Sequence, residues 1–344
     1  MKLLKFIGLY FIGSCILCSC SNEVESASEK QEQTIPETYT VSLGLEGDYI
    51  STSETPLSKA GETVKKKIYG INVYYKEDDE SEYKRYAYGL FDNVEDMTIS
   101  LISEYKYKFE CTVVKEDEDI LYCTSANEYD SPFGRGYQMS SIKYNKTYLA
   151  NKFIVSTTSS DYFFDMLKYG RTCINSGNMA SHPKMDRFYG ELAGYTPSVN
   201  GKVNINLKRT VFALKFIVTP PSDGILNVDG DGLCNIDVSS TDNIFETESL
   251  YTFYWVYDCW KAENYSENFF IVLIWKRANG VTQRFEKTIT VKRNVLTTVN
   301  ISVNGSTADA SIGFNEESTP MGNESVDMNF DGGSLEDNDV KPNE

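Results

Sequence analysis

The sequence has a single histidine, His182, among 344 residues. This residue would be the only conventional base for a Ser or Cys nucleophile, and one imidazole cannot form a histidine-based metal site. It precedes Pro183 in a segment without regular periodicity, so we interpret it as an exposed bystander. The sequence contains no phosphate-binding glycine loop. Its acidic residues gather in predicted turns and in the tail, where solvation explains them better than a paired-carboxylate site. We therefore expect no catalytic residue, no bound metal and no cofactor.

Positive charge is also scarce. The formal net charge is −17, and removal of residues 1–19, which carry two lysines and no acid, leaves 31 basic against 50 acidic side chains. A surface with this excess of negative charge repels phosphate backbones. Nucleic acid is thus excluded as a partner.

The N-terminus has an apolar run too short to span a bilayer as a stable helix. Phe6–Leu17 follows the basic residues Lys2 and Lys5, an arrangement typical of a secretory signal peptide, here residues 1–19. The sequence Leu17-Cys18-Ser19-Cys20 resembles the lipobox of bacterial lipoproteins, in which cleavage precedes a cysteine that becomes diacylated. Cys20 is the expected lipidation site because Ser19 is small. The remaining alternative is an ordinary cleaved signal.

The polar start of the mature chain is informative in a second way. Ser21–Glu25 is similar to the acidic surface-export signal of lipoproteins in the Bacteroidales. We expect lipid anchoring to the outer membrane and exposure at the cell surface. Residues 20–36 lack apolar periodicity, which predicts a flexible tether between lipid and fold.

Helical periodicity is rare in the rest of the chain, which is rich in Tyr (24) and Phe (18). Apolar residues instead recur at every second position, as in half-buried strands. The pattern predicts an all-β fold of two antiparallel β-sandwich domains in tandem, at residues 37–200 and 201–304, followed by an acidic tail at 305–344. We also expect one short helix at Asp161–Lys168. Residues 125–200 are otherwise irregular, and we interpret them as recognition loops or as poorly patterned strands. Predicted strands include 39–45, 71–75, 86–90, 97–101, 105–113, 203–207, 212–216, 251–257, 269–275, 285–291 and 299–303.

Two segments resemble the Bacteroidales fimbrillin-like (type V pilin) family. Val203–Val218 looks like the opening strand of the second domain, where an Arg precedes an Ala-containing apolar run, and Val291–Val303 is similar to the closing strands with their Arg-Asn pair. The resemblance implies two transthyretin-like β-sandwiches. It also implies a fimbrial subunit that polymerises with other subunits on the outer membrane and acts in adhesion.

The chain departs from the family pattern at the first strand, which a protease usually removes after an Arg. No arginine occurs between Cys20 and Lys84. Four lysines could serve a different protease in a segment that we interpret as loop-like, namely Lys59, Lys65, Lys66 and Lys67. Alternatively the first strand stays in place, as in an anchor subunit. Stalk, tip and anchor roles all remain open.

The acidic tail contains one clear apolar alternation, Val326, Met328 and Phe330, and a shorter Ile312, Phe314 pair. Such a segment can complete the open edge of a neighbouring subunit's sheet, so we consider it a possible donor strand. It could also add a strand to its own domain or be disordered.

One segment shows part of a calcium-loop pattern. Asn227, Asp229 and Asp231 place oxygen ligands at alternate positions before Gly232, but Val238 stands where a calcium loop has its bidentate Glu. A plain β-hairpin turn is the favoured interpretation.

Cysteine and tryptophan leave further alternatives. Cys111, Cys123, Cys173, Cys234 and Cys259 are odd in number, and Cys111 with Cys123 could form a cross-strand disulfide if a hairpin turned near Asp117. Buried free thiols are equally consistent. For function, the alternative to a fimbrial subunit is a surface glycan-binding lipoprotein. Trp255 and Trp275 alternate in phase with core residues, so Trp260 is the candidate for sugar stacking.

Overall fold

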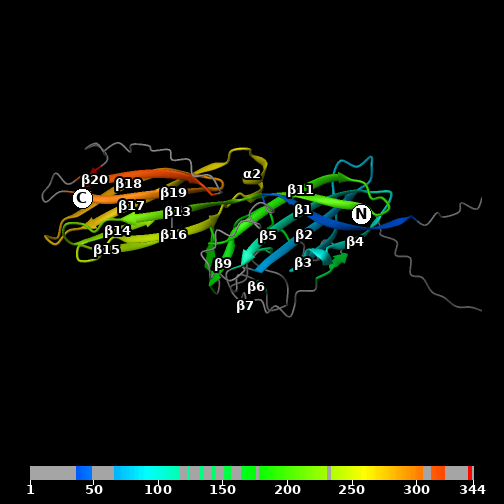
Figure 1. The fold of residues 1–344 in the computed structure, drawn as a ribbon, viewed down its shortest axis with the longest axis horizontal. Coiled ribbons are helices and arrows are strands. Elements are labelled where there is room, and N and C mark those ends of the chain that lie inside the picture. The colour runs from blue at the N-terminus through cyan, green and yellow to red at the C-terminus, as the bar shows by residue number, and fades with distance from the viewer. Residues whose placement is uncertain are drawn as a thin grey trace, which may run out of the picture. The chain divides into compact units, whose positions relative to one another are not determined.

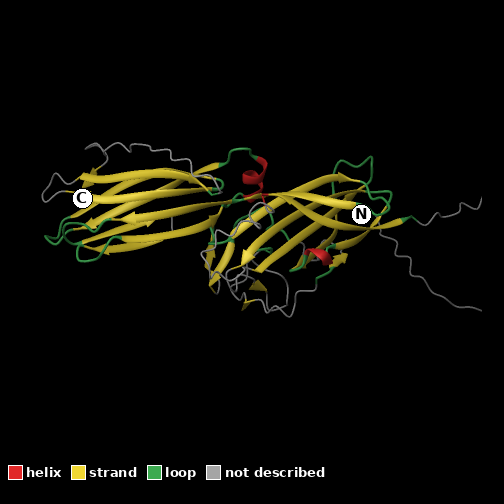
Figure 2. Ribbon diagram, in the orientation of Figure 1, coloured by secondary structure: helices red, strands yellow, loops and turns green. Residues whose placement is uncertain are grey.

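The computed structural model describes residues 36–48, 66–116, 122–123, 132–134, 142–143, 151–155, 164–175, 178–230, 234–304, 311–321 and 340–342. All of them belong to one compact unit, Pro36–Glu344. Strands dominate the ribbon (Figure 2), which confirms the predicted all-β fold. In this part of the chain, no helix has both the length and the apolar character needed to cross a membrane.

The first sandwich is an eight-stranded sheet folded over its own core (Figure 1). Its order is β4 (Thr98–Ile102), β1 (Thr38–Gly47), β12 (Lys202–Arg209), β11 (Asp186–Tyr195), β5 (Lys106–Glu116), β2 (Lys66–Lys76), β3 (Lys84–Phe91) and β8 (Phe153–Val155). β11 and β12 pair at only two positions, so the sheet divides there into two layers. Side chains from both layers, among them Val41, Phe109 and Ile205, form one buried cluster.

The second sandwich consists of two separate sheets. One has the order β16 (Phe245–Thr252), β13 (Val211–Val218), β19 (Val295–Asn304) and β20 (Ser311–Pro320). The other has the order β15 (Cys234–Ser239), β14 (Ile225–Gly230), β17 (Ser266–Lys276), β18 (Thr282–Lys292) and β21 (Val340–Pro342). Alternation explains the layering, because Phe269, Ile271, Leu273 and Trp275 are buried in β17 while the residues between them are more exposed.

The two sandwiches share one topology. The layers β4-β1-β12 and β11-β5-β2-β3 correspond, in chain order, to β16-β13-β19 and β18-β17-β14-β15. In each sandwich the pairing is antiparallel except for one parallel pair, β1 with β12 and β13 with β19. The first sandwich carries β8 beside β3 in addition, whereas the second carries β20 and β21 at the other edge.

The remaining elements are short. They are the strand pairs β6 (Tyr122–Cys123) with β7 (Ile142–Lys143) and β9 (Thr172–Asn175) with β10 (Asn178–Ala180), the 3-10 helix η1 (Val94–Asp96) and the helix α2 (Val256–Lys261).

Two local predictions were wrong. The expected strand at 251–257 ends at Thr252, and α2 begins at Val256. The expected helix at Asp161–Lys168 is a turn at residues 165–168, within the described part of that segment. The guanidinium of Arg187 donates hydrogen bonds to the backbone carbonyls of Met166, Leu167 and Tyr169, at 2.9, 3.2 and 2.7 Å. These contacts fix the turn on the sheet.

The change of sheet comes later than the predicted boundary at 200/201. Val203–Val218 forms two strands, because β12 ends at Arg209 and β13 begins at Val211. β12 pairs with β1 and β11 and belongs to the eight-stranded sheet, while β13 belongs to the second sandwich. The division into two domains stays a prediction.

Candidate functional site

The first strand of the fold is a central strand rather than an edge. β1 pairs antiparallel with β4 through residues 38–42 and parallel with β12 through residues 42–47. Its inward side chains Val41, Leu43 and Leu45 are 1%, 4% and 9% exposed. Removal of β1 would therefore expose two strand edges and an apolar groove between them.

The end of β1 is held by two arginines. The carboxylate of Asp48 accepts a hydrogen bond from the backbone N–H of Arg209 at 3.2 Å and lies 3.5 Å from the guanidinium of Arg293. Gly47 before it has φ +89°, a conformation that favours glycine. Cleavage of the chain after Asp48 would release β1, whose C-terminal end is held by the ion pair between Asp48 and Arg293.

Arg209 lies where β12 gives way to β13. Its Nε and Nη2 donate to the two carboxylate oxygens of Asp186, at 2.7 and 3.1 Å, and its Nη1 donates to Oδ1 of Asn294 at 3.2 Å. Asp186 also lies 3.5 Å from the Lys115 ammonium. Burial lowers the pKa of Lys115, and Asp186 opposes that shift while Arg209 adds to it. The bidentate geometry fixes the direction of the guanidinium.

A second charged cluster lies on the outer face of β5 and β11. The buried carboxylate of Glu110 contacts the ammonium groups of Lys108 at 2.7 Å and Lys168 at 3.0 Å and accepts a hydrogen bond from the Tyr74 hydroxyl at 2.8 Å. Lys168 also lies 3.1 Å from Glu191. Burial alone would raise the pKa of Glu110, but the two ammonium groups outweigh it and the pKa lies below its usual value. The cluster ties the 165–168 turn to the sheet.

Several predicted site residues lie outside the described part of the chain. These are Cys20, Val326, Met328, Phe330 and Asp231. Lipidation of Cys20 and strand donation by the tail stay predictions.

The predicted calcium segment forms a hairpin, since β14 pairs antiparallel with β15 from Ile225 to Gly230. Asn227 and Asp229 both lie within β14. The amide nitrogen of Asn227 donates to Asn235 and Asp237 across the hairpin, at 2.6 and 2.9 Å. Within the described ranges no group of three or more His, Cys, Asp or Glu side chains could hold a metal ion.

Two interpretations of single residues need correction. His182 is half-buried rather than exposed, and its Nε2 lies 3.4 Å from a carboxylate oxygen of Glu267. Lys66 and Lys67 are not in a loop, because β2 begins at Lys66 and Lys67 pairs with Lys115 of β5. Lys59 and Lys65 lie outside the described residues.

Of the two alternatives for Cys111, the structure shows the buried free thiol. β5 is flanked by β2 and β11, so Cys111 lies opposite Ile71 and Gly190. Cys123 lies in β6, which pairs with β7. Cys111 and Cys259 are free buried thiols, and burial raises the pKa of each.

The tryptophans exchange their expected roles. Trp275 is fully buried, as predicted, but Trp255 is 47% exposed, and its ring lies 4.7 Å from that of Tyr254 and 5.6 Å from that of Tyr169. Trp260 packs against the ring of Tyr189, at a centroid distance of 5.6 Å. The exposed tryptophan is thus Trp255 rather than Trp260.

No sequence pattern predicts the Glu110 cluster. Glu110 and Lys168 are polar residues far apart in the chain, and alternation identifies a strand face without identifying its partner. Contact with Glu191 depends on β11 being the neighbour of β5.

Comparisons with known proteins found similar solved structures only. No family model matches the chain, and no curated protein does. A Bacteroides eggerthii protein assigned to cell adhesion is 11% identical over 82% of this chain and 96% of its own, with a TM-score of 0.39. A fimbrial assembly protein from Parabacteroides distasonis is 13% identical over 83% and 100%, with a TM-score of 0.31. The fimbrial anchor protein Mfa2 from Porphyromonas gingivalis is 10% identical over 82% and 98%, with a TM-score of 0.32. TM-scores below 0.5 do not establish a shared fold.

Proposed function

We propose that this chain is a non-enzymatic surface lipoprotein that serves as a structural or anchor subunit of a fimbria and acts in adhesion. It is lipidated at Cys20, anchored to the outer membrane and joined to other fimbrial subunits by strand exchange. The observation that carries the proposal is the position of β1, a central strand close to the N-terminus with three core side chains. A fold that depends on its first strand can accept an equivalent strand from a neighbour.

The N-terminal sequence, ahead of the predicted tether, supports the same function. The lipobox resemblance at Leu17–Cys20 and the acidic residues that follow indicate a lipid-anchored surface protein. The fimbrillin resemblance depends on the residue patterns around Arg209 and around Arg293-Asn294. In the structure Arg209 and Arg293 both contact Asp48 at the end of β1, and Arg209 also donates to Asn294.

The first experiment is N-terminal mapping of the mature surface protein. A chain that begins at Cys20 and carries lipid retains β1 and fits an anchor. A chain that begins between Asp48 and Lys66 has lost β1 and fits a stalk subunit. A mature chain that starts elsewhere, inside the fold, would contradict strand exchange at β1.

The second experiment tests assembly. Sheared-cell fractions run on gels without boiling should show a ladder of oligomers, which strand-exchanged polymers produce. Val326→Asp with Met328→Asp should abolish the ladder if the tail is the donor strand, because charges would enter apolar pockets. A single lipidated band in the unmodified protein would contradict polymerisation.

The exposed aromatic group supports a second candidate, a surface glycan-binding lipoprotein. Trp255 with Tyr169 and Tyr254 offers aromatic faces of the kind that stack on sugar rings. Glycan binding that Trp255→Ala abolishes, in a protein that forms no ladder, would favour this candidate.

A further inference from the structure

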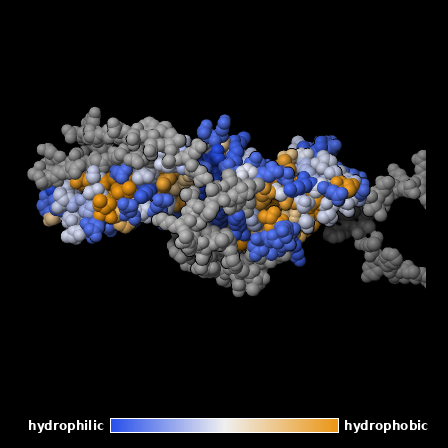
Figure 3. Space-filling model, in the orientation of Figure 1, coloured by the Kyte–Doolittle hydropathy of each residue, from blue (hydrophilic) through white to orange (hydrophobic). Residues whose placement is uncertain are grey.

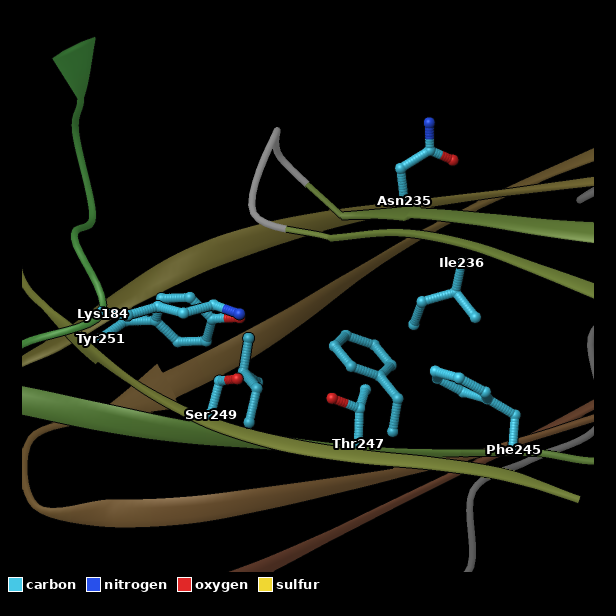
Figure 4. Close-up of a pocket in the computed structure, with 9 residues that line it drawn as sticks. Lys184, Asn235, Ile236, Phe245, Thr247, Ser249 and Tyr251 are labelled. Carbon is cyan, nitrogen blue, oxygen red and sulfur yellow. The ribbon is translucent and has the colours of Figure 1, made fainter. Parts of the chain in front are cut away.

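The second sandwich has an open edge between β15 and β16. β15 is the last strand of one sheet and β16 the last strand of the other. A cavity of about 220 Å³ lies between them (Figure 4). It is lined by residues of β16 together with Lys184, Leu214, Phe216, Asn235 and Ile236.

The cavity results from two small side chains in β16. The residues of β16 that line it are Phe245, Thr247, Ser249 and Tyr251, so the two central positions carry hydroxyl side chains. Thr247 and Ser249 lie opposite Phe216 and Leu214 of β13. Since packed sheets lie about 10 Å apart, Thr and Ser cannot fill the space that large side chains fill elsewhere in this core.

The first sandwich shows what occupies the corresponding place. By the shared topology, β3 and β4 correspond to β15 and β16. There β8 pairs with β3, and the ring of Phe153 packs on Phe91 at 4.9 Å beside the core. Among the strands that the structure describes, none pairs with the outer edge of β15 or of β16.

Charge around the opening narrows the choice of occupant. The exposed carboxylates of Asp237 on β15 and of Glu246 and Glu248 on β16 lie at the positions that alternate with the inward ones. Lys215 lies 3.3 Å from Glu246. A second copy of this chain, with its net charge of −17, would bring further negative charge. Figure 3 shows apolar residues among hydrophilic ones on the surface of the second sandwich. At the N-terminal end of β16, Ile244 and Phe245 are 59% and 38% exposed.

We infer that the β15–β16 edge is a docking groove for an extended segment of a partner protein. The segment carries aromatic or aliphatic side chains at every second position and Lys or Arg between them. It pairs with the outer edge of β16 through its main chain, places its apolar side chains in the cavity and its basic side chains beside Glu246 and Glu248, which lie on the outer face of that sheet. Strand exchange at β1 concerns the first sandwich, so this groove is a separate site.

The test uses the full mature chain and a fluorescein-labelled peptide of sequence Lys-Phe-Lys-Phe-Lys-Val-Lys, with binding followed by fluorescence anisotropy. The control peptide has the same residues in the order Lys-Lys-Lys-Lys-Phe-Phe-Val, which keeps the charge and removes the alternation. The alternating peptide should bind at least about tenfold more tightly. Equal affinities would overturn the proposal, since charge attraction alone would explain them.

Two variants locate the site. Ser249→Leu fills the cavity and Glu248→Lys reverses a charge at its rim, and each should weaken binding about tenfold. Glu263→Lys, an exposed position away from β15 and β16, is the charge-matched control and should leave binding unchanged. Glu248 is on the surface, so its variant tests the site even if Ser249→Leu fails to fold. Equal losses in Glu248→Lys and Glu263→Lys would overturn the proposal, as would displacement of the peptide by a neutral oligosaccharide.

Discussion

Arg209 donates a hydrogen bond to Asn294 across 85 positions of sequence, at 3.2 Å. The guanidinium of Arg209 also donates to the carboxylate of Asp186, and the backbone N–H of Arg209 donates to Asp48 at the end of β1. Asn294 has φ +59° at the turn before β19, and its backbone N–H donates to Val211. One residue thus joins the end of the first strand, through its backbone, to the start of β11 and the turn before β19, through its side chain.

Arg209→Lys should lower the free energy of unfolding by about 1–3 kcal/mol, because an ammonium cannot reproduce the bidentate contact with Asp186 together with the bond to Asn294. Denaturant unfolding measures the change. The matched control is Arg284→Lys, whose side chain is 36% exposed and contacts Glu286, and it should change stability by less than about 0.5 kcal/mol. Similar losses in both variants would show that the contacts of Arg209 with Asp186 and Asn294 contribute no more stability than an exposed ion pair.

Leu273→Ala should destabilise the protein by about 2–5 kcal/mol, because the side chain is 2% exposed within the core of the second sandwich. Phe270→Ala, in the same strand but 39% exposed, should cost much less. Thermal and denaturant unfolding of both variants test the inward face of β17. A loss at Phe270 equal to that at Leu273 is the result that would contradict the layering.

Glu110→Gln should make stability less dependent on pH in the acid range. The folded pKa of Glu110 lies below its ordinary value near 4.5, so the carboxylate contributes stability above the unfolded pKa. That stability is lost as pH falls through the folded pKa. Melting temperatures between pH 7 and pH 3 should therefore fall more steeply in the unmodified protein than in the variant. Glu95→Gln, at an exposed position, should keep the steep profile. Parallel profiles for Glu110→Gln and the unmodified protein would show that Lys108 and Lys168 do not stabilise this carboxylate.

Cys20→Ser should abolish incorporation of labelled fatty acid and leave unprocessed precursor in the inner membrane, because the acylated thiol is lost. Metabolic labelling followed by fractionation tests the expectation. Cys18→Ser is the matched control and should be processed normally. Labelling of the Cys20 variant at the normal level would refute the assignment of the anchor.

The sequence predicts the strands of this protein better than it predicts which strands pair with one another. Alternation at every second residue is a strong signal, and it identifies β1, β5 and β17 with their buried faces. It fails at α2, because Tyr251, Phe253, Trp255 and Tyr257 alternate as in a strand although the helix begins at Val256. The buried residues of the helix, Val256 and Cys259, lie three positions apart, a spacing that fits one face of a helix.

Pairing depends on contacts that no local pattern contains. β12 and β13 carry the same kind of alternation on either side of Thr210, yet they belong to different sheets. For the same reason the sequence leaves open whether Cys111 pairs with Cys123 or is a free thiol, a question decided by the distant strands on both edges of β5. Glu191 likewise joins the Glu110 cluster because β11 returns beside β5.

The parallel pairing of β1 with β12 sets an order of events during synthesis. Ser42 of β1 lies opposite Lys202 of β12, so about 160 residues must be made before β1 can meet this partner. Contacts at such separation form late, because closing a long loop costs entropy before the contacts repay it. Until then β1 has only β4 as a hydrogen-bonding partner strand. The first strand to be synthesised is therefore among the last to be secured, and during that interval the nascent chain is most exposed to a protease or to a competing strand.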